Sequence, residues 1–336
     1  NEIINLGFWP GGDRDGNPFV TTQITLDVAK RLHQSILKSY HLNLRKLKRR
    51  LTFSGVAHRI AHLEKVMFEN SVNNDLATLP TLDELTEELQ TIRALVINKH
   101  HSLYLDELED LINKVNLFGY HFATLDIRQD SRVHQNVFDT IISQMTDQKM
   151  VPDNFNSLSK DEQLNALASG NHTIDPETLD DPLAEKTLSS IVAIQEIQQK
   201  NGEKGANRYI ISNNQTANNV LQVYAMFKIS GFKKKVPVDI IPLFETVSDL
   251  NNAAKVMEDL YTHPIYQEHL KTRKNKQTIM LGFSDGTKDG GYLMANWSIY
   301  KAKEELTRIS RQYGVQAVFF DGRGGPPARG GGKTHQ

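Results

Sequence analysis

Cysteine is absent from all 336 residues of this chain. Its absence excludes disulfide bonds, thiolate metal sites and cysteine nucleophiles, and suits a reducing compartment such as the cytoplasm. The sequence also lacks an apolar run long enough to cross a membrane, and it has no signal-peptide pattern. We therefore expect a cytoplasmic globular chain without a membrane partner.

An excess of charge of one sign is also missing. Lysine and arginine total 39, against 40 aspartate and glutamate residues. A balanced surface gives no reason to expect nucleic acid or another polyanion as a partner for the whole chain. Any affinity for anions must therefore be local.

The first part of the chain has the periodicity of helices. Apolar residues spaced three or four apart predict a long helix from Leu26 to Leu51. Further helices are predicted over 56–68, from the capping box Thr81-x-x-Glu84 to His100, and over 105–117. We interpret residues 1–116 as a mainly helical segment.

The pattern changes after residue 116 to short apolar runs with helical segments between them. The runs cover 122–128, 208–212, 238–245, 278–285 and 317–321. The chain repeats a strand that ends in polar residues and is followed by a helix. This repetition indicates parallel βα units. Five strands are too few to close an eight-stranded barrel, and 131–207 is long enough to be a helical insertion. Residues 117–336 are therefore predicted to be a partial TIM-type βα barrel in an α/β, predominantly helical chain.

Charged residues follow the predicted strands, where βα folds bind their ligands. They are Arg128, Glu245, Asp285, Arg323 and Arg329, the last two in a glycine-rich loop that suits an anion. Two carboxylates beside arginines favour a divalent cation that holds a phosphorylated or carboxylated substrate. Oxygen ligands of this kind suit Mg²⁺ or Mn²⁺. Lys288, one turn after Asp285, could add a positive charge.

Each of these residues also has a purely structural interpretation. Asp285 could be the N-cap of the following helix. Arg128 could form an ion pair with Asp126 or Asp130. The sequence Asp13-Arg14-Asp15 could serve only a turn.

Taken together, five ordered motifs resemble phosphoenolpyruvate carboxylase of the bacterial type. They are Gly-Gly-Asp-Arg-Asp-Gly-Asn-Pro at 11–18, Leu-Asp-Ile-Arg-Gln-Asp at 125–130, Pro-Leu-Phe-Glu-Thr at 242–246, Phe-Ser-Asp-Gly-Thr-Lys-Asp at 283–289, and Gly-Arg-Gly-Gly with a second Arg-Gly-Gly at 322–331. The resemblance is interrupted mainly between about 136 and 207. Because family members are longer at both ends, and no initiator methionine is present, we interpret the chain as their central part.

The resemblance implies a reaction for the parent protein. Phosphoenolpyruvate and bicarbonate would give oxaloacetate and phosphate through carboxyphosphate and a metal-bound enolate. This is an anaplerotic carbon fixation step that feeds the tricarboxylic acid cycle. The resemblance also implies a homo-oligomeric parent, a tetramer in the family.

The matched residues acquire roles by the same resemblance. Glu245 and Asp285 would bind Mg²⁺ or Mn²⁺, which stabilises negative charge on the enolate. Arg128 and Arg329 would bind the substrate phosphate, with Arg323 and Lys288 adding positive charge. An apolar pocket for the substrate methylene and for CO₂ would be formed by Trp9, Leu243 and Met280.

Two departures from the family pattern accompany this match. Asp321 stands where the family commonly has a histidine, which leaves any proton-handling role at that position in doubt. Pro326-Pro327-Ala328 stands where many relatives have a glycine before the second arginine. The family's essential histidine lies in a motif upstream of Asn1, so we expect no appreciable turnover from these 336 residues alone.

Two other classes of function are compatible with single features of the sequence. An RNA-binding module could use the Arg-Gly-Gly segment as a flexible backbone contact, although RNA-binding tails sit in low-complexity surroundings and this one follows the apolar run Val318-Phe-Phe. A non-catalytic regulatory domain is the second alternative. The presence of both Glu245 and Asp285 argues against it.

Overall fold

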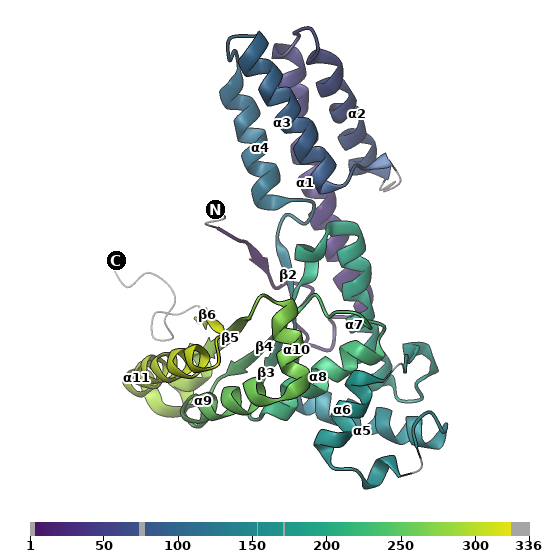
Figure 1. Ribbon diagram of the computed structural model, residues 1–336, viewed down its shortest axis with the longest axis vertical. Helices are drawn as coiled ribbons and strands as arrows, with labels where there is room; N and C mark the ends of the chain where they lie inside the picture. The colour runs from purple at the N-terminus through teal and green to yellow at the C-terminus, as the bar shows by residue number, and fades with distance from the viewer. Residues whose placement is uncertain (1–3, 74–77, 153, 171, 324–336) are drawn as a thin grey trace. The chain divides into compact units, whose positions relative to one another are not determined.

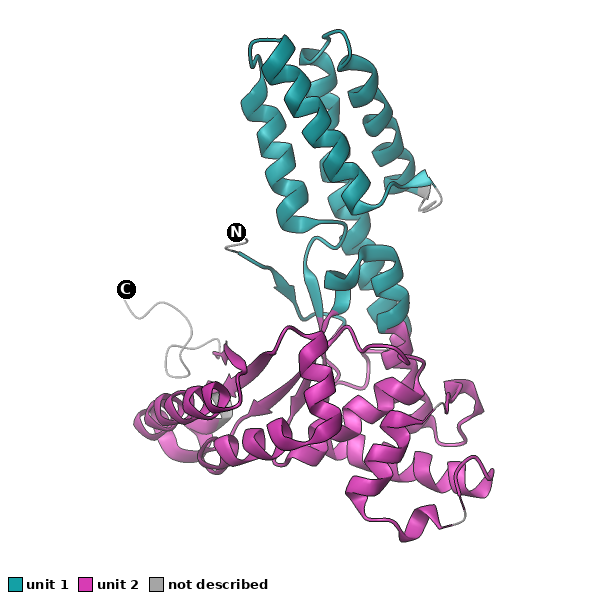
Figure 2. Ribbon diagram, in the orientation of Figure 1, with its two compact units in different colours: residues 1–11, 23–125, 194–206 teal, residues 12–22, 126–193, 207–336 magenta. Residues whose placement is uncertain are grey.

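The structure is a computed structural model that describes residues 4–73, 78–152, 154–170 and 172–323 (Figure 1). The chain forms two compact units (Figure 2). The first unit comprises residues 1–11, 23–125 and 194–206, and the second comprises 12–22, 126–193 and 207–336. Each unit therefore contains segments that are distant in sequence. The domain boundary expected between residues 116 and 117 stays a prediction.

Four long helices make up most of the first unit. They are α1 (Thr22–Arg50), α2 (Ala57–Asn73), α3 (Leu82–Lys99) and α4 (Leu105–Phe118). Their apolar faces meet in one core that includes Leu37, Leu44, Ile60, Leu89 and Leu108. The predicted capping box of α3 is present: the Glu84 backbone N–H donates to Thr81 Oγ1, and the Thr81 N–H donates to Glu84 Oε2. The prediction of a helical first segment is confirmed.

A parallel sheet forms the centre of the second unit. Its strands are β2 (Thr124–Asp130), β3 (Arg208–Ser212), β4 (Asp239–Phe244), β5 (Lys276–Gly282) and β6 (Gln316–Gly322), paired in this order. All five strands were predicted. A sixth strand, β1 (Gly7–Phe8), pairs with Thr124 and Leu125 in the first unit. It was missed because two residues are too few to show an alternating pattern.

Seven helices accompany this sheet. They are α5 (Ser131–Asp147), α6 (Lys160–Ser169), α7 (Pro182–Asn201), α8 (Ala217–Ile229), α9 (Val247–Thr262), α10 (Pro264–Thr272) and α11 (Phe283–Gln312). Helices α8 and α9 contact β4, and α11 contacts β5 and β6. The first three helices occupy the segment between β2 and β3, which confirms the predicted helical insertion. The partial βα barrel in a predominantly helical α/β chain is also confirmed.

The end of β5 differs from the prediction. The strand was expected to reach Asp285, but it ends at Gly282, and α11 begins at the next residue. Gly282 is the N-cap of α11, so Asp285 lies inside the first turn and is not the cap. The helix is interrupted at Gly291, whose φ of 77° and ψ of 169° are not helical. After this interruption the helix continues to Gln312.

Candidate functional site

Arg128 on β2 is held beside the loop that carries Asp13. The Arg128 backbone N–H donates to the Gly12 carbonyl at 3.1 Å, and the Arg14 N–H donates to the Arg128 carbonyl at 2.9 Å. Asp13 and Arg128 consequently form a parallel bridge. The backbone of the loop therefore fixes where the side chains of Asp13 and Asp15 lie.

The Arg128 guanidinium contacts three carboxylates. Its Nη2 lies 2.5 Å from Asp15 Oδ2 and 3.6 Å from Glu245 Oε1, and its Nη1 lies 3.5 Å from Asp13 Oδ2. All four side chains are partly buried, with exposed fractions between 16% and 29%. We call these residues the strand-end cluster. Counted over these four residues alone, one positive charge meets three negative ones, a formal excess of two negative charges. Arg132 also interacts electrostatically with Asp15 and Glu245.

Burial adds to the cost of this excess. Desolvation raises the pKa of Asp13 above its usual value, although the charge of Arg128 opposes the rise. Asp13 therefore resists ionisation more than an exposed aspartate does. A cation that entered the cluster would favour the ionised form.

Glu245 follows β4 and is oriented by the end of β3. Its Oε2 accepts a hydrogen bond from the Asn213 backbone N–H at 3.1 Å. Asn213 has a φ of 52°, in the left-handed region that asparagine tolerates better than most residues. The Ser131 hydroxyl donates to the Asn213 carbonyl at 2.6 Å and so supports this turn. Sequence reasoning did not identify Asn213, because its role depends on backbone conformation.

The first turn of α11 packs against the backbone of Glu245. A Cβ atom at Gly282 would lie 3.3 Å from Glu245 Cα, and one at Gly286 would lie 3.2 Å from the Glu245 carbonyl oxygen. The Val247 N–H also donates to Asp289 Oδ2 at 3.1 Å. Asp285 belongs to this turn, but its side chain lies outside what the structure describes. The backbone nevertheless brings the two predicted metal ligands to adjacent turns.

The chemistry of these donors fits a hard divalent cation. Carboxylate oxygens suit Mg²⁺ and Mn²⁺, and the negative excess of the strand-end cluster favours positive charge. Among the described side chains, no three acidic residues or histidines are close enough together to form a ready metal site. A cation here would therefore be bound by Glu245 together with a ligand from outside that set, such as Asp285.

The predicted cationic residues lie around the ends of β5 and β6. Lys288 is exposed on α11, and Arg323 is exposed directly after β6. The Arg323 guanidinium carbon lies 5.3 Å from the centre of the Phe283 ring, at the start of α11. Arg329 lies outside the described residues.

Leu243 and Met280 are brought together by the sheet. They are register partners on β4 and β5, and both are buried. The Met280 side chain reaches Gly322, where an added Cβ would lie 2.8 Å from Met280 Cε. These two residues form one apolar wall. Trp9 is half-buried in the first unit, so its part in the same pocket stays a prediction.

Comparison with known proteins identifies the family. A family profile described as phosphoenolpyruvate carboxylase matches residues 1–75 and 57–336. Proteins named phosphoenolpyruvate carboxylase from Nitrosomonas eutropha and Nitrosomonas europaea are each 32% identical, over 99% of this chain. The chain belongs to the phosphoenolpyruvate carboxylase family. It spans 41% of the length of each of these two relatives.

Asp321, the departure from the carboxylase pattern, has a structural partner. Its carboxylate oxygens lie 2.7 and 2.9 Å from Lys303 Nζ on α11. Its register partner on β5 is Leu281, which is fully buried. Asp321 thus links β6 to its neighbouring helix by an ion pair.

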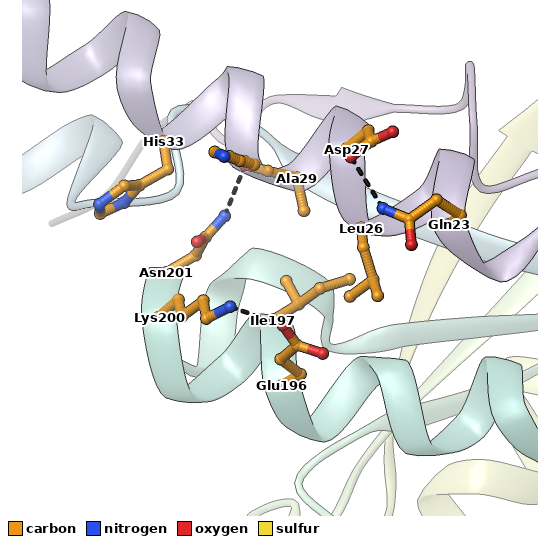
Figure 3. Close-up of a pocket in the computed structure, with 10 residues that line it drawn as sticks. Gln23, Leu26, Asp27, Ala29, His33, Glu196, Ile197, Lys200 and Asn201 are labelled. Atoms are coloured by element: carbon orange, nitrogen blue, oxygen red, sulfur yellow. Dashed lines mark hydrogen bonds and ion pairs between the residues drawn. The ribbon is translucent and has the colours of Figure 1, made fainter. Parts of the chain in front are cut away.

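A cavity in the first unit shows a different balance of charge (Figure 3). It has a volume of about 360 Å³ and lies between α1 and the end of α7. Lys200 Nζ pairs with Glu196 at 2.5 Å, and the Gln23 amide donates to Asp27 at 3.0 Å, as the dashed lines in Figure 3 show. Its acidic groups already have partners, and it lacks the excess seen in the strand-end cluster.

Two further findings concern the start of the Arg-Gly-Gly segment and the expected absence of a membrane partner. Strand β6 runs directly into Gly322, as expected for a strand-end loop, while residues 324–336 lie outside the described part. None of the described helices combines the length and the hydropathy needed to span a bilayer.

Proposed function

We propose that the protein containing this chain converts phosphoenolpyruvate and bicarbonate into oxaloacetate and phosphate. The observation that carries the proposal is the strand-end cluster, where excess carboxylate surrounds Arg128 and Glu245 abuts the turn of Asp285. Membership of the carboxylase family supports it. The proposed role in carbon fixation and in replenishing the tricarboxylic acid cycle follows from the same reaction.

Glu245 and Asp285 would hold Mg²⁺ or Mn²⁺ in this proposal. The bound cation would supply positive charge where negative charge develops on the substrate. A cation at Glu245 would also weaken the attraction of that carboxylate for Arg128. Asp15 and Asp13 also contact the guanidinium, so the substrate phosphate would compete with these two carboxylates for its N–H groups.

The remaining residues would complete the substrate site. Arg329 would bind the phosphate with Arg128, and Arg323 and Lys288 would add positive charge as phosphate transfers to bicarbonate. The wall of Leu243 and Met280, with Trp9, would exclude water from the substrate methylene and from CO₂. We further propose a cytoplasmic homo-oligomer that binds no nucleic acid and no membrane.

An oxaloacetate-coupled assay of the full-length protein tests this function. We expect metal-dependent turnover that EDTA abolishes and Mg²⁺ or Mn²⁺ restores. Glu245→Gln and Arg128→Gln should each lower kcat by about 100-fold or more, because each removes charge that acts on the reacting groups. The matched controls are Glu268→Gln and Arg308→Gln, whose side chains are 70% and 59% exposed.

Full turnover by either site variant would contradict the assignment. The 336 residues expressed alone are proposed to show no appreciable turnover, because they span 41% of the relatives' length. Normal rates from this chain alone would refute that part of the proposal. No observation on the described residues favours the RNA-binding or regulatory alternatives.

A further inference from the structure

A second cavity is lined in part by the loop that carries Asp13 and Asp15. Its volume is about 220 Å³, and all of its lining residues belong to the second unit. They come from the loop after Gly12, from the end of β2 and from the first half of α7. We call it the loop cavity. Arg14, which stands between the two aspartates of the strand-end cluster, forms part of its wall.

The loop cavity is positively charged. Arg14 and Lys186 both line it, and no acidic side chain appears among the lining residues that the structure describes. The Arg14 Nε donates to the Val20 carbonyl at 3.2 Å, which fixes the plane of the guanidinium. Burial lowers the pKa of Arg14, so its charged form carries a desolvation cost that an anion would offset.

The polar groups around Arg14 favour an acceptor as the ligand. The Gln129 Oε1 accepts from the Asp130 N–H at 2.9 Å, so the amide NH₂ of Gln129 is the end left to donate. The Thr187 and Ser190 hydroxyls donate to helix carbonyls at 2.7 Å and contribute no donor to the cavity. The charged donors that line the cavity are the guanidinium of Arg14 and the ammonium of Lys186. The amides of Gln129 and Asn17 and the hydroxyls of Thr21 and Thr22 are neutral groups in the same wall.

The rest of the wall is apolar. Pro18, Val20 and Leu183 line the same cavity. Inorganic phosphate would leave these surfaces without a partner, whereas an organic acid would cover them. A volume of about 220 Å³ is below the roughly 300–1,000 Å³ of pockets that take drug-sized ligands, which limits the ligand to a short chain.

We propose that the loop cavity binds a small aliphatic carboxylate, with its charged group on Arg14 and Lys186 and its alkyl chain on Val20 and Leu183. This site is separate from the proposed carboxylase site and does not depend on that reaction. Both involve the same loop, because Asp13 and Asp15 contact Arg128 while Arg14 lines the cavity.

Equilibrium dialysis of the 336-residue chain with radiolabelled butyrate tests the proposal. We expect one saturable site of roughly millimolar affinity, as is reasonable for a ligand of six heavy atoms. Butanol and inorganic phosphate should compete at least about tenfold more weakly, since each lacks one half of the recognised chemistry. Equal competition by phosphate or by butanol would overturn the assigned ligand class.

Variants locate the binding. Arg14→Gln should weaken butyrate binding about tenfold or more, and Lys186→Gln about threefold. Leu183→Asp introduces a carboxylate at an exposed position and should abolish binding even if Arg14→Gln fails to fold. Lys200→Gln on the same helix and Arg323→Gln at the candidate carboxylase site should have no effect. Unchanged binding by Leu183→Asp, or loss of binding by Arg323→Gln, would refute the location.

Discussion

The helical bundle of the first unit and the strand-end cluster of the second differ in how many carboxylates each arginine contacts. Two ion pairs between helices of the bundle each join one arginine to one carboxylate: Arg59 lies 2.7 Å from Glu88, and Arg93 lies 2.7 Å from Glu109. In the strand-end cluster one arginine meets three carboxylates. Each of these pairs in the bundle is neutral, whereas the four residues of the strand-end cluster hold an excess of negative charge that a bound cation would neutralise.

The same difference separates the region whose apolar core stabilises the protein from the region whose charged groups can bind a ligand. Exposed one-to-one pairs contribute about 0–1 kcal/mol each, so the stability of the bundle rests on its apolar core. The strand-end cluster keeps like charges together in a partly buried place, which costs stability. Such a cost is common where a site must bind charged ligands.

Removing core volume from the bundle should have the largest effect on stability. Leu44 is 1% exposed, and Leu44→Ala should lower the free energy of unfolding by about 2–5 kcal/mol because it leaves a cavity. Leu42→Ala is the matched control, since Leu42 is 48% exposed on the same helix. Urea unfolding followed by circular dichroism measures both. Equal losses would contradict the assigned core.

A buried histidine of the second unit, His134, should make the stability of the protein sensitive to acid. His134 Nε2 and the Tyr209 hydroxyl form a hydrogen bond of 2.9 Å. Burial lowers the pKa of His134 to about 3. It therefore stays neutral in the folded state while the unfolded chain binds a proton near pH 6.5. Stability is fully present above pH 6.5 and falls as pH drops, by up to about 2 kcal/mol between pH 6.5 and 5.

His134→Gln should flatten this dependence in urea unfolding measured across that pH range. Burial also lowers the pKa of His269 to about 3, so part of the slope should persist in the variant. A slope unaffected by His134→Gln would assign the acid sensitivity to other groups.

Breaking the strand-end cluster should have an intermediate effect. Arg128→Gln leaves three carboxylates without their shared cation and should cost about 1–3 kcal/mol at pH 7. Adding Asp13→Asn and Asp15→Asn should recover part of this loss, because the repulsion falls. Arg93→Gln in the bundle should cost less than about 1 kcal/mol. Thermal unfolding of Arg128→Gln, of the same variant with both aspartates replaced, and of Arg93→Gln tests the comparison, and the absence of any recovery would refute the charge excess.

The smallest effects are expected at the helix caps. Thr81→Ala on α3 and Ser159→Ala on α6 each remove one side of a capping box and should cost about 1 kcal/mol. The two values should agree although the caps belong to different units. A loss above about 2 kcal/mol at either site would show that the residue does more than cap its helix.

The helices were predictable because their signals are local. Apolar residues spaced three or four apart predicted α1, and the capping box at Thr81 marked the start of α3 correctly. The strands were recognisable by their apolar runs, although β1 was too short and β5 ended three residues early. That end depends on how closely Gly282 approaches Glu245, which is a tertiary contact.

The candidate site was only partly predictable. Its charged strand-end residues could be chosen from sequence, because βα folds place such residues at one edge of the sheet. The pairing of Arg128 with Asp13 and Asp15 joins residues more than 110 positions apart, and sequence offered Asp126 and Asp130 as nearer partners. In the structure Asp126 pairs with Arg208, and Asp130 pairs with Arg132.

Titration of the 336-residue chain with Mn²⁺, followed by electron paramagnetic resonance of the free ion, tests the central claim most directly. We predict one site whose affinity falls about tenfold or more in Glu245→Gln and in Asp285→Asn, and is unchanged in Glu268→Gln. Equal affinity in all four proteins would contradict the claim that the ends of β4 and β5 form a cation site.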